Sequence, residues 1–240
     1  MTEAEKLVFL SCMQELQEYD TPTVSNAVAT YPGKATCLSL FDPHETLWYT
    51  DDHLHSLYPD LGARCGFAVT CVYGVPSGNE ALGMADVLQA IAAINAPVIL
   101  VMKQNMPESL AHRSAMIGGN MLTAFSCAGA VGIIGDGPAR DVQEMKPLNV
   151  PCLFSGLTAA HGPVAVEAVN VPVSVASMDV VPMDVIHMDG NGAVRFPAQY
   201  LPEIVRLVKE IQHADEKRQR MLRSTTNPEK LGQYMKEVYD

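Results

Sequence analysis

The sequence predicts an α/β fold built around a sheet that contains parallel strands. Between residues 66 and 156, apolar runs rich in Val, Ile and Leu alternate with segments whose apolar residues recur at helical spacing. Strands of this kind, separated by helices, are typical of a sheet covered on both faces. A chain of 240 residues, 48% hydrophobic and 18% charged, can bury one substantial core. We therefore expect a single domain over 1–240, with N-terminal helices in 1–30, a core in 62–200 and a helical extension in 201–240.

The N-terminal segment predicts two helices. Residues 3–18 alternate apolar and polar side chains at helical spacing. A second helix is expected to start at Thr21, which we interpret as its N-cap, with Pro22 in the first turn. Residues 31–62 are rich in turn formers and give only weak indications of strands.

The core is predicted to alternate between strands and helices. Their limits follow the change between continuous apolar runs and helical spacing. The expected strands are 66–73, 96–103, 129–135 and 150–156, and the expected helices are 80–94, 118–129 and 139–148. Parallel strands connected in this way end at a common edge of the sheet, where ligands of open α/β folds usually bind.

The chain then changes to short strands and ends in helices. Residues 168–181 and 184–197 carry alternating apolar side chains, and the sequence DGNG at 189–192 is typical of a hairpin turn. Residues 198–223 have an apolar face in their first half and are strongly charged in the second, and another short helix is expected from Pro228. We expect the charged half to pack on a neighbouring subunit.

Charge limits the classes of partner. The formal net charge is −11, and a nucleic acid or an anionic membrane requires a concentrated positive surface instead. We therefore expect neither partner. Residues 1–201 hold only 8 basic residues against 20 acidic ones, so each basic side chain there is informative.

Cysteine usage and hydropathy indicate the compartment. The six cysteines are scattered, mostly within apolar runs, and none forms a C-x-x-C pair. We interpret them as small buried hydrophobic residues in a reducing environment. The start of the chain has no signal-peptide pattern, and the longest apolar runs are too short to span a bilayer. We expect a cytoplasmic protein.

The stretch 118–141 is the most informative for chemistry. Two glycines precede a helix whose first turn contains residues 120–122, so backbone N–H groups there can bind an anion. One strand later, Arg140 and Asp141 follow the sequence GDGPA, which we interpret as a loop. We expect the helix start and the pair at one edge of the sheet. The two side chains should diverge, so that one grips a carboxylate while the other holds a divalent ion.

A second interpretation of this stretch stays open. Arg140 and Asp141 could simply cap a helix, with the two glycines forming a turn, because short motifs of this kind often occur without function.

Several separated stretches resemble one known family. They are TPTVSNAV, GFAVTC, GNMLTAF, GAVGIIGDGPARD and VVPMDVIHMDGNGAVRFP, in this order between about residues 20 and 200. Together they are similar to the ribonuclease-activity-regulator-A-like proteins and the 4-hydroxy-4-methyl-2-oxoglutarate aldolases. The glycine-rich loop of a cofactor-dependent methyltransferase does not follow the first strong strand.

The resemblance implies a β/β/α swivelling-type fold, assembled as trimers or hexamers with the active site between subunits. It implies a class II aldolase or oxaloacetate decarboxylase, in which Mg²⁺ or Mn²⁺ chelates a pyruvate moiety and stabilises its enolate. Asp141 would hold the metal, partly through waters, and Arg140 would face the keto or carboxylate oxygens. The helix start at Gly119, with the amides of Met121 and Leu122, would bind the carboxylate.

The sequence departs from the family at three positions. The aldolases usually have an acidic residue where Asn120 stands; Asn120 can hydrogen-bond a water but brings no charge, and it is a catalytic candidate with Arg140. The ribonuclease regulators tend to carry Arg-Asp-x-Asp, whereas this chain has Gln143 at the last position. Met183 replaces a usual glycine, which we interpret as a turn variant.

A cluster of polar residues offers a second metal hypothesis. Asp51, Asp52, His53 and His55 are close in sequence, and a His-x-His pair on a strand can bind zinc. No further pair of soft ligands is near in sequence, so a solvated loop is the alternative.

Other polar residues could reach the same edge. His112 and Arg113 precede the two glycines, and His161 follows a strand, where a histidine could transfer a proton. Lys103 is expected to end a strand at this edge, so a Schiff base is conceivable. Glu216 could be contributed to the site by a neighbouring subunit, or it could lie on a solvated helix face.

Two functions therefore remain. The first is a divalent-metal-dependent lyase that acts on a pyruvate-containing oxo acid, by retro-aldol cleavage of a 4-hydroxy-2-oxo dicarboxylate or by decarboxylation of oxaloacetate. The second is a non-catalytic protein that binds another protein, as the ribonuclease regulators do.

Overall fold

The computed structural model describes residues 3–29, 36–44 and 46–239. Four parallel strands form the centre of its main sheet, in the order β5-β4-β3-β2. These strands are β2 (Arg64–Gly74), β3 (Val98–Asn105), β4 (Ala130–Ala139) and β5 (Cys152–Leu157). Their continuous apolar sequence fits this position, because a central parallel strand is covered on both faces.

Antiparallel strands extend the sheet on both sides. β1 pairs with β5, β9 with the start of β2, β10 with β9, and β6 with the end of β2. Their bounds are β1 (His55–Ser56), β6 (Ala165–Val169), β9 (Val185–Asp189) and β10 (Gly192–Phe196). The β9–β10 hairpin confirms the turn predicted at 189–192.

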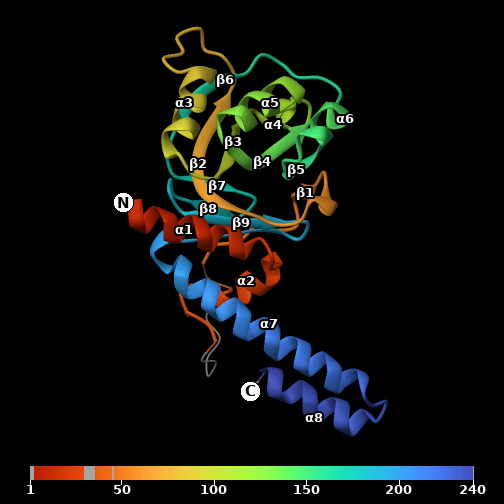
Figure 1. Cartoon of the computed structure of the whole chain (residues 1–240). Helices are drawn as coiled ribbons and strands as arrows, with labels where there is room; N and C mark the ends of the chain where they lie inside the picture. Colours follow the sequence, from red (N-terminus) through yellow and green to blue (C-terminus); the bar gives the residue numbers. More distant parts are fainter. Residues whose placement is uncertain (1–2, 30–35, 45, 240) are drawn as a thin grey trace.

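Different layers cover the two faces of the central strands. Leu100 and Met102 pack in a cluster with residues of α3 and α5, whereas Ile99 and Val101 pack against the β7–β8 hairpin. The elements concerned are α3 (Met84–Ile94), α4 (Glu108–Ala111), α5 (Gly119–Ala128), α6 (Val142–Met145), β7 (Val173–Val175) and β8 (Met178–Val180). The layering is therefore hairpin, main sheet and helices, as the β/β/α class requires (Figure 1).

Helices from both ends of the chain form a third cluster. Met13, Val24 and Ile204 pack there with Phe196 and Trp48. The helices are α1 (Glu3–Leu16), α2 (Thr21–Val28), α7 (Leu201–Arg223) and α8 (Pro228–Tyr239), and short 3₁₀ helices cover Pro59–Leu61, Lys146–Leu148 and Ala198–Tyr200. The predicted α/β fold with flanking N- and C-terminal helices is confirmed.

The long C-terminal helix extends away from the layers of the sheet, and α8 folds back along it (Figure 1). The first half of α7 is buried, whereas most of its second half is exposed. No helix among the described residues is long and apolar enough to cross a membrane. Parts of the predicted terminal and turn-rich segments, namely residues 1, 2, 30–35, 45 and 240, lie outside the described residues.

The predicted N-cap at Thr21 is wrong by one residue. Oδ1 of Asp20 accepts the N–H of Thr23 at 2.9 Å and caps α2, with Pro22 in the first turn as predicted. Thr21 is buried instead, and its hydroxyl lies 3.0 Å from Nδ1 of His187. An exposed carboxylate can serve as the cap while the threonine is used for a buried contact.

Three further boundaries differ from the prediction. The helix expected over 80–94 begins at Met84, because Gly83 is its N-cap and donates its N–H to Asp86. β4 does not stop at residue 135 but continues through a register shift to Ala139. The helix expected over 139–148 is therefore reduced to α6 and one 3₁₀ turn.

The cysteines only partly match their predicted burial. All six are free thiols, and Cys65, Cys71 and Cys152 are buried. Cys127 is exposed near the end of α5, so the prediction was wrong there. Burial raises the pKa of the Cys152 thiol to about 12, which keeps it protonated and unreactive.

Candidate active site

The start of α5 presents free backbone amides. Gly118 is the N-cap of the helix, and its carbonyl accepts the N–H of Leu122 at 3.0 Å. Within the described part of the chain, the N–H groups of Asn120 and Met121 have no backbone or side-chain acceptor, so both are available to an anion. The predicted role of the Leu122 amide is wrong, because that amide closes the first turn of the helix.

Two glycines let carboxylates approach this helix start. A Cβ on Gly118 would lie 2.5 Å from Oδ2 of Asp141, and a Cβ on Gly119 would lie 2.5 Å from Oε2 of Glu144. The N–H of Gly119 also lies 3.3 Å from Oδ2 of Asp141 and donates to it. The glycines therefore allow the backbone to position the Asp141 carboxylate directly.

Arg140 and Asp141 lie at the same edge, directly after β4. The N–H of Arg140 donates to the carbonyl of Ile117 at 3.1 Å, which ties the strand end to the segment before α5. The predicted proximity of the pair and the helix start is confirmed. The two side chains do not diverge as expected, since Nε of Arg140 lies 3.3 Å from Oδ2 of Asp141. Asp141 has a left-handed backbone (φ 58°), which turns the chain sharply here.

The interpretation of the pair as a simple helix cap holds only in part, because Asp141 accepts the N–H of Gly119 at the start of α5 but does not cap α6. Asp141 occupies the N-cap position of α6, yet its side chain makes no capping hydrogen bond. The terminal nitrogens of Arg140 bind no acceptor among the described residues. Both side chains are about one-third exposed, at 34% and 31% respectively. They are therefore available to a ligand.

A pocket of about 360 Å³ opens beside the pair. Its lining comes from the end of β4 with the start of α6, and from the end of β5: Arg140, Asp141, Val142, Leu157, Thr158 and Ala159. The two walls are held together because Leu157 pairs with Ala139 and the N–H of Thr158 donates to the Ala139 carbonyl at 3.0 Å.

Several residues of this site were not predicted from the sequence, among them Glu144, Tyr58 and the pocket residue Leu157. Glu144 reaches back to Gly119 from α6, and its spacing of three residues from Asp141 is the signal that could have indicated it. Tyr58 donates its hydroxyl to the carbonyl of Val142 at 2.6 Å and thus supports the turn after Asp141. No local sequence signal marks Tyr58, because it lies 84 positions away in a turn-rich segment.

Lys103 is held in an ion pair. Its Nζ lies 2.6 Å from Oδ2 of Asp136, whose Oδ1 accepts the N–H of Gln104, also at 2.6 Å. β3 continues beyond Lys103 to Asn105, and Lys103 does not line the pocket beside Arg140. The Schiff-base hypothesis therefore finds no support.

The remaining candidates lie outside the pocket lining. His112, Arg113 and His161 are all exposed near the edge of the sheet, but none belongs to either wall. Glu216 is exposed on α7, where it lines a separate hollow of about 420 Å³ with the α1–α2 turn. Its contribution to a site in a neighbouring subunit remains a prediction.

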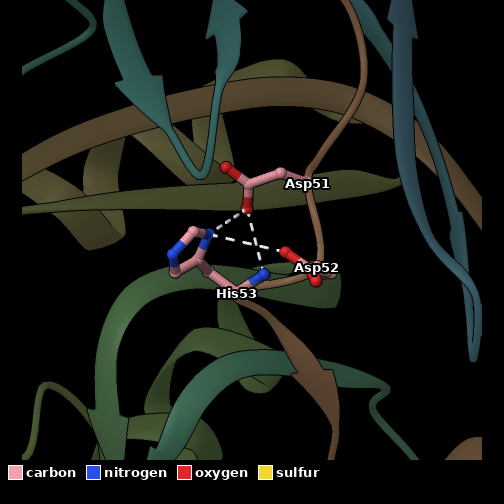
Figure 2. Close-up of side chains that lie close together, drawn as sticks. All are labelled: Asp51, Asp52 and His53. Atoms are coloured by element: carbon pink, nitrogen blue, oxygen red, sulfur yellow. Dashed lines mark hydrogen bonds and ion pairs between the residues drawn. The ribbon is translucent and has the colours of Figure 1, made fainter.

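A second group of possible metal ligands is shown in Figure 2. Ligand atoms of Asp51, Asp52 and His53 all lie within 4.8 Å of one another, and His55 is not part of the group. Nδ1 of His53 lies 3.0 Å from Asp51, whose other oxygen accepts the hydroxyl of Ser177. Burial opposes the ionised form of Asp51, but these hydrogen bonds outweigh it and lower its pKa. His53 is 78% exposed, and hydrogen bonds within the group account for its geometry.

The residues beside α5 fit a hard divalent cation. Within the described part of the chain, Oδ1 of Asp141 accepts no hydrogen bond, so it is free to act as a ligand. Glu144 adds a second carboxylate against Gly119. A site with one or two carboxylates and several waters is typical of Mg²⁺. Asp141 and Glu144 are therefore the residues that would hold such an ion.

A protein-family model for RraA-like proteins, described as Aldolase/RraA, matches residues 21–195. This chain belongs to the RraA-like family. The RraA-like chain is 32% identical over 114 residues to an uncharacterised protein of Methanocaldococcus jannaschii, covering 47% of this chain and 55% of that protein. It thus matches only about half the length of that relative. It is also 26% identical over 152 residues to a Halalkalibacterium halodurans protein with the provisional name 4-hydroxy-4-methyl-2-oxoglutarate aldolase, covering 60% and 72% of the two chains.

Solved structures support the fold of this RraA-like protein. An uncharacterised protein from Pseudomonas syringae pv. tomato has a TM-score of 0.69 at 21% identity, covering 95% of this chain and 93% of that one. RraAS2 from Streptomyces coelicolor, described as an unusual member of the RNase ES inhibitor RraA family, has a TM-score of 0.65 at 21% identity, covering 86% and 94%. At these identities the likeness shows the fold alone.

Proposed function

We propose that this RraA-like protein is a divalent-metal-dependent lyase that acts on a pyruvate-containing oxo acid. One observation carries the proposal: Arg140 and Asp141 line one pocket, and the Asp141 carboxylate also contacts the start of α5, where two amides are free. The similarity to a relative named as an aldolase supports the same class of reaction. The reaction is retro-aldol cleavage of a 4-hydroxy-2-oxo acid, including the dicarboxylates, or decarboxylation of oxaloacetate.

The amides and Arg140 would bind the carboxylate and keto oxygens of the pyruvate moiety. In retro-aldol cleavage the C3–C4 bond breaks, its electron pair stays on C3, and the 4-hydroxyl loses its proton as the departing fragment becomes a carbonyl compound. C3 then takes up a proton and gives pyruvate. Negative charge develops next to Arg140, where a preorganised cation stabilises it. A Mg²⁺ or Mn²⁺ ion held by Asp141 would supply Lewis-acid stabilisation of the same charge.

Asn120 is exposed at the first turn of α5 and is the remaining catalytic candidate. Its side-chain amide can hydrogen-bond a water, although it cannot act as a general base. An Asn120→Asp variant therefore supplies the carboxylate that the family resemblance leads one to expect. We predict that it retains or raises activity.

The test is pyruvate release from 4-hydroxy-2-oxo acids and from oxaloacetate, with Mg²⁺ or Mn²⁺ and then with a chelator. Activity should disappear with the chelator and return with the metal. Arg140→Ala should lower kcat/KM by roughly 10²–10³. Arg113→Ala is the matched control, because it removes the same charge from an exposed residue outside the pocket. Full activity in chelator, or in Arg140→Ala, contradicts the proposal.

The second candidate is a protein-binding regulator without turnover. It is favoured by Asn120, which brings no carboxylate to a position where the aldolases usually have one. A pull-down that captures a ribonuclease complex, combined with no pyruvate release in any metal, would favour this function over the lyase.

A further inference from the structure

We propose that the pocket beside Arg140 selects oxo acids whose distal end is neutral and aliphatic, and that Leu157 determines this preference. The inference rests on the proposed function and narrows its substrate class. It departs from the dicarboxylates that the family resemblance implies. The observations that carry it are the composition of the pocket walls and the charges around them.

The wall contributed by β5 is aliphatic. Leu157 is 59% exposed although it is a large apolar residue, and it lines the pocket with Ala159. On the opposite wall, Val142 follows directly after Asp141. Thr158 adds one hydroxyl group and no charge. A ligand that extends from Arg140 across the pocket therefore meets carbon atoms, and covering Leu157 removes apolar surface from water.

The same walls offer a single cation. Arg140 is that cation, and it is already 3.3 Å from Asp141. Binding the carboxylate of the pyruvate moiety would occupy its free nitrogens. Glu144 lies nearby, against Gly119, and adds negative charge. A second substrate carboxylate in this pocket would find no cationic partner in the lining, so any loss of its hydration on binding is costly.

Other basic residues near this edge, Arg113 among them, lie outside the pocket lining. Lys103 is paired with Asp136 at 2.6 Å. Among the described residues, therefore, the pocket lining contains no second cation to receive a distal carboxylate.

The binding of two matched probes tests the preference for a neutral distal end without relying on turnover. 2-Oxopentanoate and 2-oxoglutarate have the same carbon chain and the same pyruvate end, and they differ only in a distal methyl or carboxylate group. Neither carries the 4-hydroxyl that retro-aldol cleavage requires. With Mg²⁺ present, calorimetry on the full chain should give a Kd for 2-oxopentanoate that is lower by roughly tenfold.

Leu157→Arg should reverse the preference, because it supplies the missing cation on the exposed wall. Leu157→Met should keep it. Leu47→Arg is the matched control, since Leu47 is 50% exposed, lies outside the pocket lining, and gives the same change in net charge. It should leave both Kd values unchanged.

The outcomes separate this inference from the proposed function. Tighter binding of 2-oxoglutarate by the wild type, binding of neither probe, or an equal response to Leu157→Arg and Leu47→Arg would overturn the inference. Selective binding of 2-oxopentanoate without pyruvate release from any 4-hydroxy-2-oxo acid would support the inference and contradict the lyase function.

Discussion

At the scale of single residues, the site depends on short approaches that only glycine permits. Gly118 and Gly83 are both N-cap residues with almost the same backbone, φ −149° and ψ −175° against φ −146° and ψ −173°. They differ in their surroundings: a Cβ on Gly118 meets Asp141 at 2.5 Å, whereas nothing lies within 4 Å of a Cβ on Gly83. The two glycines therefore form a natural comparison.

Gly118→Ala should impair the site while Gly83→Ala should not. The added methyl group displaces the Asp141 carboxylate, so we expect metal affinity and kcat/KM to fall by at least tenfold, with a stability cost of about 1–3 kcal/mol. Metal titration and urea unfolding of both variants provide the measurement. Equal effects of the two substitutions would contradict the role assigned to Gly118.

Met183 occupies a left-handed turn position with φ 74°. This agrees with the prediction of a turn variant at a position where the family usually has glycine. Such a backbone is strained for a long side chain. Met183→Gly should therefore raise the free energy of unfolding by about 1 kcal/mol. Asn149→Gly, at φ 55°, is the control. Its free energy of unfolding should rise less, because Asn tolerates the left-handed region. Denaturant titration decides, and a loss of stability in Met183→Gly would refute the argument.

The sequence allowed part of the site to be predicted. Arg140 and Asp141 could be placed beside α5, because the ends of parallel strands share one edge of the sheet. The contribution of Leu157 could not be predicted, since it depends on the register of β5 against β4. The role of Leu122 was misjudged because the exact first residue of a helix decides which amides are free.

At the scale of elements, a buried histidine joins α1 and α2 to β9. Nε2 of His187 lies 2.9 Å from the carbonyl of Leu16 and Nδ1 lies 3.0 Å from the hydroxyl of Thr21. The N–H of Thr21 donates to Asp189 at 2.8 Å. Burial lowers the pKa of His187 below 6.5, although the Leu16 carbonyl and Asp189 act in the opposite direction. The folded state therefore favours the neutral ring.

This histidine should make stability depend on pH. Below pH 6.5 His187 is protonated in the unfolded chain but stays neutral in the folded protein, because its pKa there is lower. The free energy of unfolding therefore falls as the pH falls towards the lowered pKa. The slope from this one group is at most about 1.4 kcal/mol per pH unit. Urea unfolding between pH 7 and 5.5 should show a steeper loss in the wild type than in His187→Gln. The exposed His213→Gln should behave like the wild type; identical slopes in all three would exclude the effect.

The central strands were predictable and the capping details were not. β2 to β5 contain apolar runs of strand length between turn-forming residues, a pattern that favours buried strands over helices. The cap of α2 was misplaced because Asp20 and Thr21 are both good capping residues, and the choice between them depends on the distant His187. Tertiary contacts therefore decided what local chemistry left open.

At the scale of the whole molecule, the C-terminal helices divide into a buried and a projecting part. Ile204 and Val208 of α7 are fully buried with the N-terminal helices, whereas none of the three buried clusters contains a residue of α8. The match to the family model ends at residue 195. The projecting part is therefore expected to serve association with a neighbouring subunit and not the stability of the fold.

Removing residues 225–240 should leave the chain folded, with a change in unfolding free energy of less than about 1 kcal/mol. Ile204→Ala should cost about 2–5 kcal/mol by comparison. Sedimentation should show a trimer or hexamer for the full chain and weaker association for the shortened one. Unchanged association would argue against contacts through α8.

The acidic balance of the chain sharpens the account of the site. The proposed anionic substrate would approach a protein of net charge −11, so it would need local positive groups. Beside Asp141 these are the start of α5 and Arg140, and the proposed divalent cation would add to them. Because the carboxylates of Asp141 and Glu144 lie here, a bound divalent cation would bring the local charge closer to zero.

Anomalous scattering from a crystal soaked with Mn²⁺ and oxalate tests the central claim most directly, since oxalate mimics the enolate of pyruvate. The account predicts a manganese peak at Asp141, with oxalate on Arg140 and on the amides of Asn120 and Met121. Manganese at the Asp51–His53 group alone, or oxalate bound away from Arg140, would contradict it.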